Sequence, residues 1–173
     1  MNKGLLVVII SAIVIGSGAL TYVTYGSGRL VVDITDPPQG WGPATSVYIH
    51  YSQVKLHRAN AENESGWVTV VDSEGWVDLK ETLNASKTLG VAELQAGTYN
   101  LVRFEILEAK VTVDGMNYTA PVESGKLNIA IVKGGVTIQA GQTTTLTIDI
   151  TPKVVGSKAG GFKLVPAAKA LPS

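Results

Sequence analysis

The sequence has 173 residues, no cysteine, two histidines, and 14 basic against 14 acidic side chains. The lack of cysteine excludes disulfides, thiolate nucleophiles, cysteine-ligated metal centres and a lipid-modified N-terminal cysteine. Two histidines are too few for a three-histidine metal site. With a net charge of zero, the chain does not have the excess of basic residues that is typical of a nucleic-acid-binding domain, so we expect no nucleic-acid partner.

The N-terminus carries the longest apolar run of the chain. From Leu5 to Tyr25 there are 21 residues without a charged side chain. As a helix rising about 1.5 Å per residue, this run is roughly 30 Å long, which matches the hydrocarbon core of a bilayer. Lys3 precedes it, which favours an N-terminus inside and everything after Gly26 outside. We therefore expect residues 1–27 to be a signal or transmembrane segment with a short linker.

Three fates of this segment remain open. An uncleaved helix would anchor the protein by a single pass, with the C-terminal domain outside the cell membrane. A secretory signal would be cleaved after Ala19, with Ser17 as the other small residue of the site, and would leave a secreted or cell-surface protein. Cleavage after Gly4, as in archaeal pilin-type signals, would keep the helix for packing in a filament core.

From residue 28 onward the sequence has the period of β-strands. Residues 28–35 alternate apolar and polar side chains, and a pair of prolines then ends the strand. In residues 46–58 the apolar positions change parity halfway. One extra residue in a strand restores the inward facing, so we predict a β-bulge near Ser52 and Gln53.

Further short strands follow, punctuated by glycine, and no stretch after residue 28 shows a sustained helical period. Residues 67–71 and 76–79 read as two strands of a hairpin, and residues 81–87 as a short helix or irregular segment. We predict an all-β fold: an antiparallel β-sandwich of about seven to ten strands, immunoglobulin- or transthyretin-like, over residues 28–166. One apolar helix precedes it and a tail, residues 167–173, follows it. The other expected strands are 96–106, 110–113, 117–120, 126–132, 136–139, 140–150 and a last one containing Phe162 and Leu164.

Five short segments form a recognisable combination. They are Gly28-Arg29-Leu30-Val31-Val32-Asp33-Ile34-Thr35-Asp36-Pro37-Pro38; the strand from Val47 to His57 with its V-x-L-H ending; Val77-Asp78-Leu79; Ala96-Gly97-Thr98-Tyr99 with Arg103; and Ala140-Gly141 leading to Leu146-Thr147-Ile148-Asp149. Together they resemble the domain of unknown function 4382 family over roughly residues 28–166. The resemblance implies an exported β-sandwich domain of bacterial and archaeal cell surfaces with no established activity. Many members resemble lipoproteins, whereas this chain has no cysteine to lipidate.

Few side chains could carry chemistry. His50 and His57 are the only imidazoles, and an unbroken strand would send them to opposite faces, although the predicted bulge could bring them to one. We interpret them as polar residues on a strand face, and we expect no catalytic residue and no cofactor.

Two groups of carboxylates flank predicted turns. One is Asp33 with Asp36; the other is Asp72, Glu74 and Asp78 around a glycine, which resembles a fragment of a calcium loop without its full spacing. The latter three are the candidate metal ligands. The competing interpretation is turn capping, in which an aspartate accepts a hydrogen bond from a backbone amide two residues on.

Two further sets of residues are suited to surface roles. Asn63, Asn84 and Asn117 begin N-glycosylation sequons in a chain that we expect to be exported. The three tryptophans could form a sugar-binding platform, although packing in the core or at a sheet edge is their commoner role. They are Trp41, Trp67 and Trp76.

These features favour a non-catalytic, exported cell-surface protein with a structural or binding role. An alternative is a filament subunit in which residues 20–27, freed by cleavage, complete a neighbour's sheet. Another is an anchored accessory subunit of a membrane complex. The expected partners are thus the membrane, through the run from Leu5 to Tyr25, a second copy of the chain, or another envelope protein. Residues 28–98 carry nine acidic and five basic groups and residues 99–173 five and eight, a division that would suit head-to-tail contact.

Overall fold

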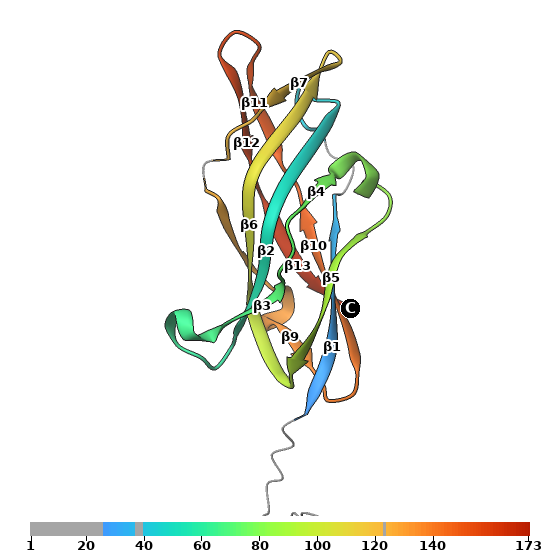
Figure 1. The fold of residues 1–173 in the computed structure, drawn as a ribbon, viewed down its shortest axis with the longest axis vertical. Coiled ribbons are helices and arrows are strands. Elements are labelled where there is room, and N and C mark those ends of the chain that lie inside the picture. Colours follow the sequence, from blue (N-terminus) through green and yellow to red (C-terminus); the bar gives the residue numbers. More distant parts are fainter. Residues whose placement is uncertain (1–25, 37–39, 123) are drawn as a thin grey trace, which may run out of the picture.

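The computed structural model describes residues 26–36, 40–122 and 124–173. These ranges form thirteen β-strands and three short 3₁₀ segments, which confirms the all-β prediction (Figure 1). In the part of the chain that is described, no helix has the length and apolar character needed to cross a membrane. The predicted N-terminal helix, with the run from Leu5 to Tyr25 and the cleavage position at Ala19, lies outside the described residues.

The elements follow one another with short connections. The strands are β1 (Ser27–Thr35), β2 (Ser46–Arg58), β3 (Trp67–Val71), β4 (Gly75–Asp78), β5 (Lys87–Gln95), β6 (Gly97–Val113), β7 (Met116–Thr119), β8 (Lys126–Ala130), β9 (Val136–Ile138), β10 (Thr143–Ile150), β11 (Lys153–Ser157), β12 (Gly161–Val165) and β13 (Ala168–Pro172). The 3₁₀ segments are η1 (Asn63–Gly66), η2 (Leu79–Thr82) and η3 (Val132–Gly134).

The larger sheet has seven strands and is organised around the antiparallel pair β2 and β6. At 17 residues, β6 is the longest strand, and it joins two stretches that the sequence suggested were separate strands. Its free edge is covered in succession by β9, β8 and β7, while β3 and β4 cover the free edge of β2.

The predicted hairpin of residues 67–71 and 76–79 is wrong. Both β3 and β4 pair antiparallel with β2, β3 at residues 54–57 and β4 at residues 48–51. They are therefore two pieces of one interrupted edge strand. The 3₁₀ segment η2 occupies Leu79–Thr82, so the expected short helix also begins earlier than predicted.

The predicted β-bulge in β2 is confirmed. Tyr51 is opposite Ile106 and Gln53 is opposite Glu105, so Ser52 is an extra residue in β2. The structure adds two irregularities that the sequence did not reveal: Leu107 is an extra residue in β6 directly beside the first bulge, and Asn100 is another near the start of β6. Because a bulge reverses side-chain parity, apolar side chains on both sides of it face the core.

The smaller sheet has the order β13, β10, β1, β5. Its central pair, β1 and β10, is parallel, so the expectation of a wholly antiparallel arrangement is wrong. The segment expected as a C-terminal tail is also a strand of this sheet: β13 pairs with β10, with Ala168 opposite Ile150 and Pro172 opposite Leu146. The last strand is therefore β13, and residues 162 and 164 belong to a separate hairpin of β11 and β12.

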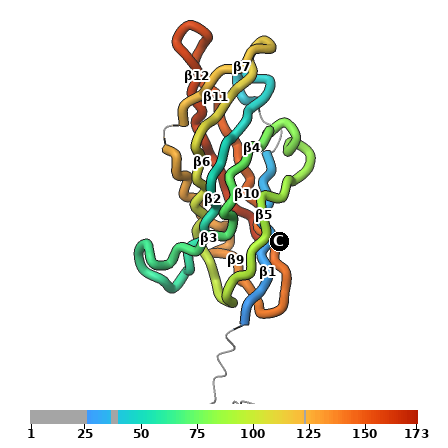
Figure 2. The backbone as a smooth tube through the Cα atoms, viewed as in Figure 1, coloured from blue at the N-terminus to red at the C-terminus, as the bar shows by residue number. Residues whose placement is uncertain are grey.

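The core is one cluster of buried side chains drawn from both sheets. From the smaller sheet, alternate residues such as Leu30 and Ile148 are fully buried, and from the larger sheet Leu56 and Phe104 are. The start of β1, the β5–β6 turn and the β9–β10 turn lie at one end of an elongated molecule, and the β11–β12 hairpin lies at the other (Figure 2). Without disulfides, burial and strand pairing supply the stability.

We predict that Leu56→Ala lowers the free energy of unfolding by about 2–5 kcal/mol, because it leaves a cavity at a fully buried site. The matched control is Leu107→Ala, which removes the same atoms from a side chain that is 56% exposed and should cost about 0.5 kcal/mol or less. Denaturant-induced unfolding measures both. Equal losses in the two variants would contradict this description of the core.

Candidate functional site

The outer face of the larger sheet, turned away from the core, carries an open hollow of about 210 Å³. Its lining residues, which we call the aromatic hollow, are Tyr48, Trp76, Lys110 and Asn117. The register of the strands brings them together, since Tyr48 is opposite both Asp78 of β4 and Lys110 of β6. The hollow is therefore a product of sheet pairing across β4, β2, β6 and β7.

The indole of Trp76 is held in place while remaining 40% exposed. It stacks on the imidazole of His50 with ring centroids 4.5 Å apart and an interplanar angle of 5°. Lys110 Nζ lies 4.4 Å from the Trp76 ring centroid, a cation–π distance. His50 Nε2 is also 2.8 Å from Glu74 Oε1, which fixes the imidazole from its other end. The result is a rigid, partly bare aromatic surface.

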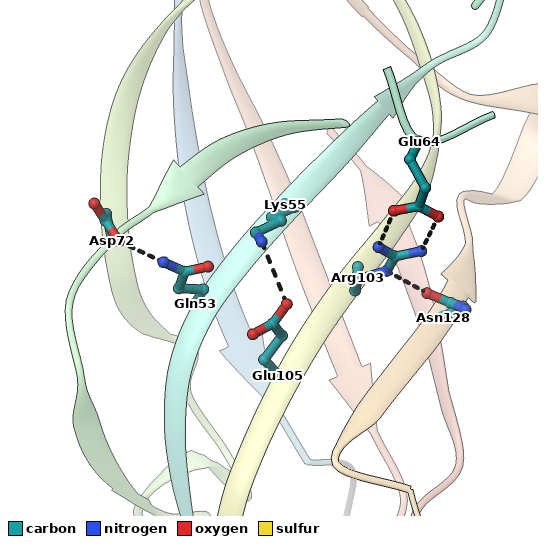
Figure 3. A network of polar contacts seen from close by, with 7 residues as sticks. All are labelled: Gln53, Lys55, Glu64, Asp72, Arg103, Glu105 and Asn128. Carbon is teal, nitrogen blue, oxygen red and sulfur yellow. Dashed lines mark hydrogen bonds and ion pairs between the residues drawn. The ribbon is translucent and has the colours of Figure 1, made fainter. Parts of the chain in front are cut away.

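A second cluster on the same sheet centres on Arg103. Its guanidinium carbon lies 4.0 Å from the Trp67 ring centroid, and its NH1 and NH2 groups donate to the two carboxylate oxygens of Glu64 at 2.8 and 3.1 Å. Arg103 Nε donates to Asn128 Oδ1 at 3.0 Å (Figure 3). The bidentate pairing lowers the pKa of Glu64 and raises the pKa of Arg103. All hydrogen-bonding nitrogens of the guanidinium are thus engaged.

Two further polar contacts continue this cluster along β2 and β6. Lys55 Nζ lies 3.4 Å from Glu105 Oε1, and Gln53 donates to Asp72 Oδ1 at 2.7 Å (Figure 3). These contacts link β2 to its neighbours on both sides. They make the outer face a network of fixed side chains rather than a set of independent charges.

Both histidines lie on the outer face, as the bulge allowed, but they serve different clusters. His50 supports the aromatic hollow by stacking on Trp76. His57 Nε2 is 2.8 Å from the carbonyl oxygen of Asn63, and its ring meets Trp67 edge-on at 4.9 Å. Within the described ranges, histidine, aspartate and glutamate form no group of three that could hold a metal ion.

The three calcium candidates bind three different partners. Asp72 accepts from Gln53, Glu74 pairs with His50, and Asp78 accepts from Ser46 at 2.9 Å. Asp78 also accepts from the backbone amide of Lys80 at 2.9 Å, two residues on. Turn capping is therefore correct for Asp78, and the structure does not bring the three carboxylates together.

The other predicted carboxylates occupy opposite environments. Asp33 accepts from the Thr88 hydroxyl at 2.7 Å on the exposed side of the smaller sheet. Asp36 is fully buried and accepts from the Trp41 indole at 2.7 Å, while its second oxygen has no hydrogen-bond partner among the described residues. Burial raises the pKa of Asp36 to about 6; the Trp41 hydrogen bond opposes the shift, and the charge of Asp149 adds to it.

The tryptophans and sequon asparagines are now placed. Trp41 is a core residue, whereas Trp67 and Trp76 lie on the outer face. Asn63, Asn84 and Asn117 are all exposed. Sequence reasoning gave no site role to Tyr48, Lys110 or Arg103, because strand partners far apart in the chain bring them beside the tryptophans.

Comparisons with known proteins give one family match. A model described as a domain of unknown function (DUF4382) matches residues 27–166. Among solved structures, a protein from Bacteroides eggerthii DSM 20697, provisionally described as a cell adhesion protein, matches with 11% identity and a TM-score of 0.34. That match covers 84% of this chain and 56% of the other, so this chain spans little more than half of that protein. A likeness at this level carries no argument, and no curated protein matches.

We predict that stability falls as the pH rises from about 4 to 6, because the folded protein holds the Asp36 proton more tightly than the unfolded chain does. The shift of about two pKa units corresponds to at most about 3 kcal/mol. Asp36→Asn keeps an acceptor for Trp41 but cannot ionise, so it should remove this decline in unfolding experiments between pH 4 and 7. Asp72→Asn, at an exposed site, is the control, and a decline that persists in Asp36→Asn would refute the assignment.

Proposed function

The chain belongs to the DUF4382 family, and from that premise we propose that it is a non-catalytic, exported cell-surface protein with a structural or binding role. The apolar run from Leu5 to Tyr25 supports export. The structural support comes from the outer face of the larger sheet, where the reactive side chain types are already engaged with one another.

The main support for a non-catalytic role is that both imidazole side chains are engaged in contacts with neighbouring residues. General acid–base or nucleophilic catalysis requires a base within reach of the group that it activates. Here His50 is stacked on Trp76 and paired with Glu74, and His57 is bonded to the backbone of Asn63. Each imidazole stabilises a local arrangement of strands, which suits a protein that works by presenting a rigid surface.

We also infer that the two sheets form a β-sandwich of the immunoglobulin or transthyretin kind. The single core cluster formed by both sheets supports this. The strands alternate buried and exposed residues, as strands with one covered face do. The parallel pair of β1 and β10 is the feature in which this arrangement departs from the simplest antiparallel form.

Surface location can be tested on intact cells of the natural host with a membrane-impermeant amine reagent followed by peptide mass spectrometry. We expect labelling at the exposed Lys80, Lys133 and Lys153 of the folded domain, and none at Lys3 if the N-terminal segment is retained. A cytoplasmic protein of the same cells is the control. Labelling of these domain lysines only after cell lysis would overturn the proposal.

A second candidate function, a subunit of an extracellular filament, is favoured by the place where β1 begins. Near this level β5 ends at Gln95, opposite Ser27, and β10, which runs parallel to β1, begins at Thr143, opposite Arg29. The Gly26 carbonyl accepts from Ala96, and the Ser27 carbonyl accepts from Gly141. Both edges of the first residues of β1 are thus occupied. A β-prone segment before Gly26 would need the sheet of another copy to continue its ladder, as in donor-strand assembly.

For this candidate we expect deletion of residues 20–25 to abolish filaments seen by electron microscopy of the natural host. The deletion stops before Gly26 because Gly26 and Ser27 already bond within the domain. A finer pair is Thr24→Pro, which removes a ladder donor, against Thr24→Ala, which keeps it. Filaments that survive the deletion, or a wild-type protein that forms none, would rule out donor-strand assembly.

A further inference from the structure

One of the three sequons lies at the rim of the aromatic hollow. Asn117 and Thr119 belong to β7, where residues two apart share a face. Asn117 is opposite Thr112 and Thr119 is opposite Lys110, so both sequon positions are on the outer face of the sheet. Tyr118, between them, turns inward and meets Phe162 edge-on at 5.0 Å.

The turn before β7 fixes this placement. Asp114 and Gly115 connect β6 to β7 with φ values of 49° and 76°, as a two-residue hairpin of the primed type requires. Such a tight connection leaves no freedom for the register to slip. Asn117 is therefore held beside the hollow by backbone geometry and not by a mobile loop.

Asn117 is also chemically available. It is exposed on an edge strand, and the Thr112 hydroxyl donates to its amide oxygen Oδ1 at 2.7 Å. The amide nitrogen, to which an N-linked sugar would be joined, is not used by that hydrogen bond. Thr119, the third sequon residue, is exposed on the same strand.

The hollow has the chemistry and size to receive a sugar ring. Trp76 is 40% exposed and lines the hollow with Tyr48, so the C–H groups of a pyranose could pack against the parts of these rings that His50 and Lys110 leave uncovered. Lys110 Nζ can donate to sugar hydroxyls at the rim. At about 210 Å³ the hollow is smaller than the roughly 300–1,000 Å³ of a pocket for a drug-sized ligand. A single ring attached at its edge suits it better than a larger free ligand.

We propose that Asn117 carries an N-linked glycan whose first sugar, a hexose or N-acetylhexosamine, packs into the aromatic hollow against Trp76 and Tyr48. Asn63 and Asn84 are exposed too, but neither is among the residues that line this hollow. The inference rests on export in the proposed function and is independent of filament assembly. In this arrangement the glycan covers the exposed part of the Trp76 indole and becomes part of the outer face.

The test uses the full chain purified from its natural host. Glycopeptide mass spectrometry should find Asn117 occupied. Thr119→Val removes the sequon without touching Asn117, and Thr119→Ser, the matched control, retains it. Relative to Thr119→Ser, Thr119→Val should lose the glycan, shift tryptophan emission to longer wavelength as Trp76 meets water, and lower Tm by about 2–4 °C.

A third variant, Trp76→Ala, separates packing from mere attachment. In the Trp76→Ala background, Thr119→Val should leave Tm within error of Thr119→Ser, because the stacking partner is gone. If Trp76→Ala does not fold, the tryptophan emission of Thr119→Val compared with that of Thr119→Ser still tests the packing, because both proteins retain Trp76. An unmodified Asn117 in surface-labelled protein would overturn the inference, as would a glycan whose loss changes neither emission nor Tm. Failure of the domain lysines to label would instead refute export.

Discussion

Twelve residue pairs join β2 to β6, and every other strand of the larger sheet pairs with one of these two. This ladder accommodates two neighbouring bulges, Ser52 on one strand and Leu107 on the other, and a further register shift between His57 and Arg58. The bulges keep apolar side chains facing the core on both sides of the irregularity. They also keep Tyr48, His50 and His57 on one outer face. Alternate side chains of a strand point to opposite faces of the sheet. The bulges therefore decide which side chains face the core and, at the same time, which face outward.

The outer face gains its rigidity from cross-strand contacts rather than from any single strong bond. Trp76 is held by His50 and Lys110, and Trp67 is held by Arg103, which Glu64 binds at both of its terminal nitrogens. Exposed ion pairs stabilise little individually, but stacking removes apolar area from water at the same time. The face is consequently ordered while leaving one indole partly bare. An ordered face with a partly exposed indole is suited to binding a partner or to packing against an attached sugar.

The sequence divides its charges between an acidic first half and a lysine-rich C-terminal end, but the ion pairs within the fold do not simply join these two parts. Two of the C-terminal lysines pair within the second half of the chain: Lys169 lies 3.0 Å from Asp149, and Lys158 lies 2.6 Å from Asp114. Asp36 is buried beside Trp41, and one of its carboxylate oxygens has no hydrogen-bond partner among the described residues. A buried carboxyl stabilises the fold best when protonated, so it marks the end of β1 as the pH-sensitive point of the core.

The sequence by itself determined the all-β class, the family resemblance and the bulge near Ser52, because each depends on patterns within short segments; for Asp78 it left turn capping and metal binding both open. Alternation, turn residues and parity changes are local signals. The tertiary structure alone decided that β1 pairs parallel with β10, that β3 and β4 share one edge of β2, and that the last residues form β13. It also decided which side chains surround Trp67 and Trp76. Strand partners and cross-strand neighbours are separated by tens of residues, and short strands of similar composition can pair in many ways, so only the packed sheets select one of them.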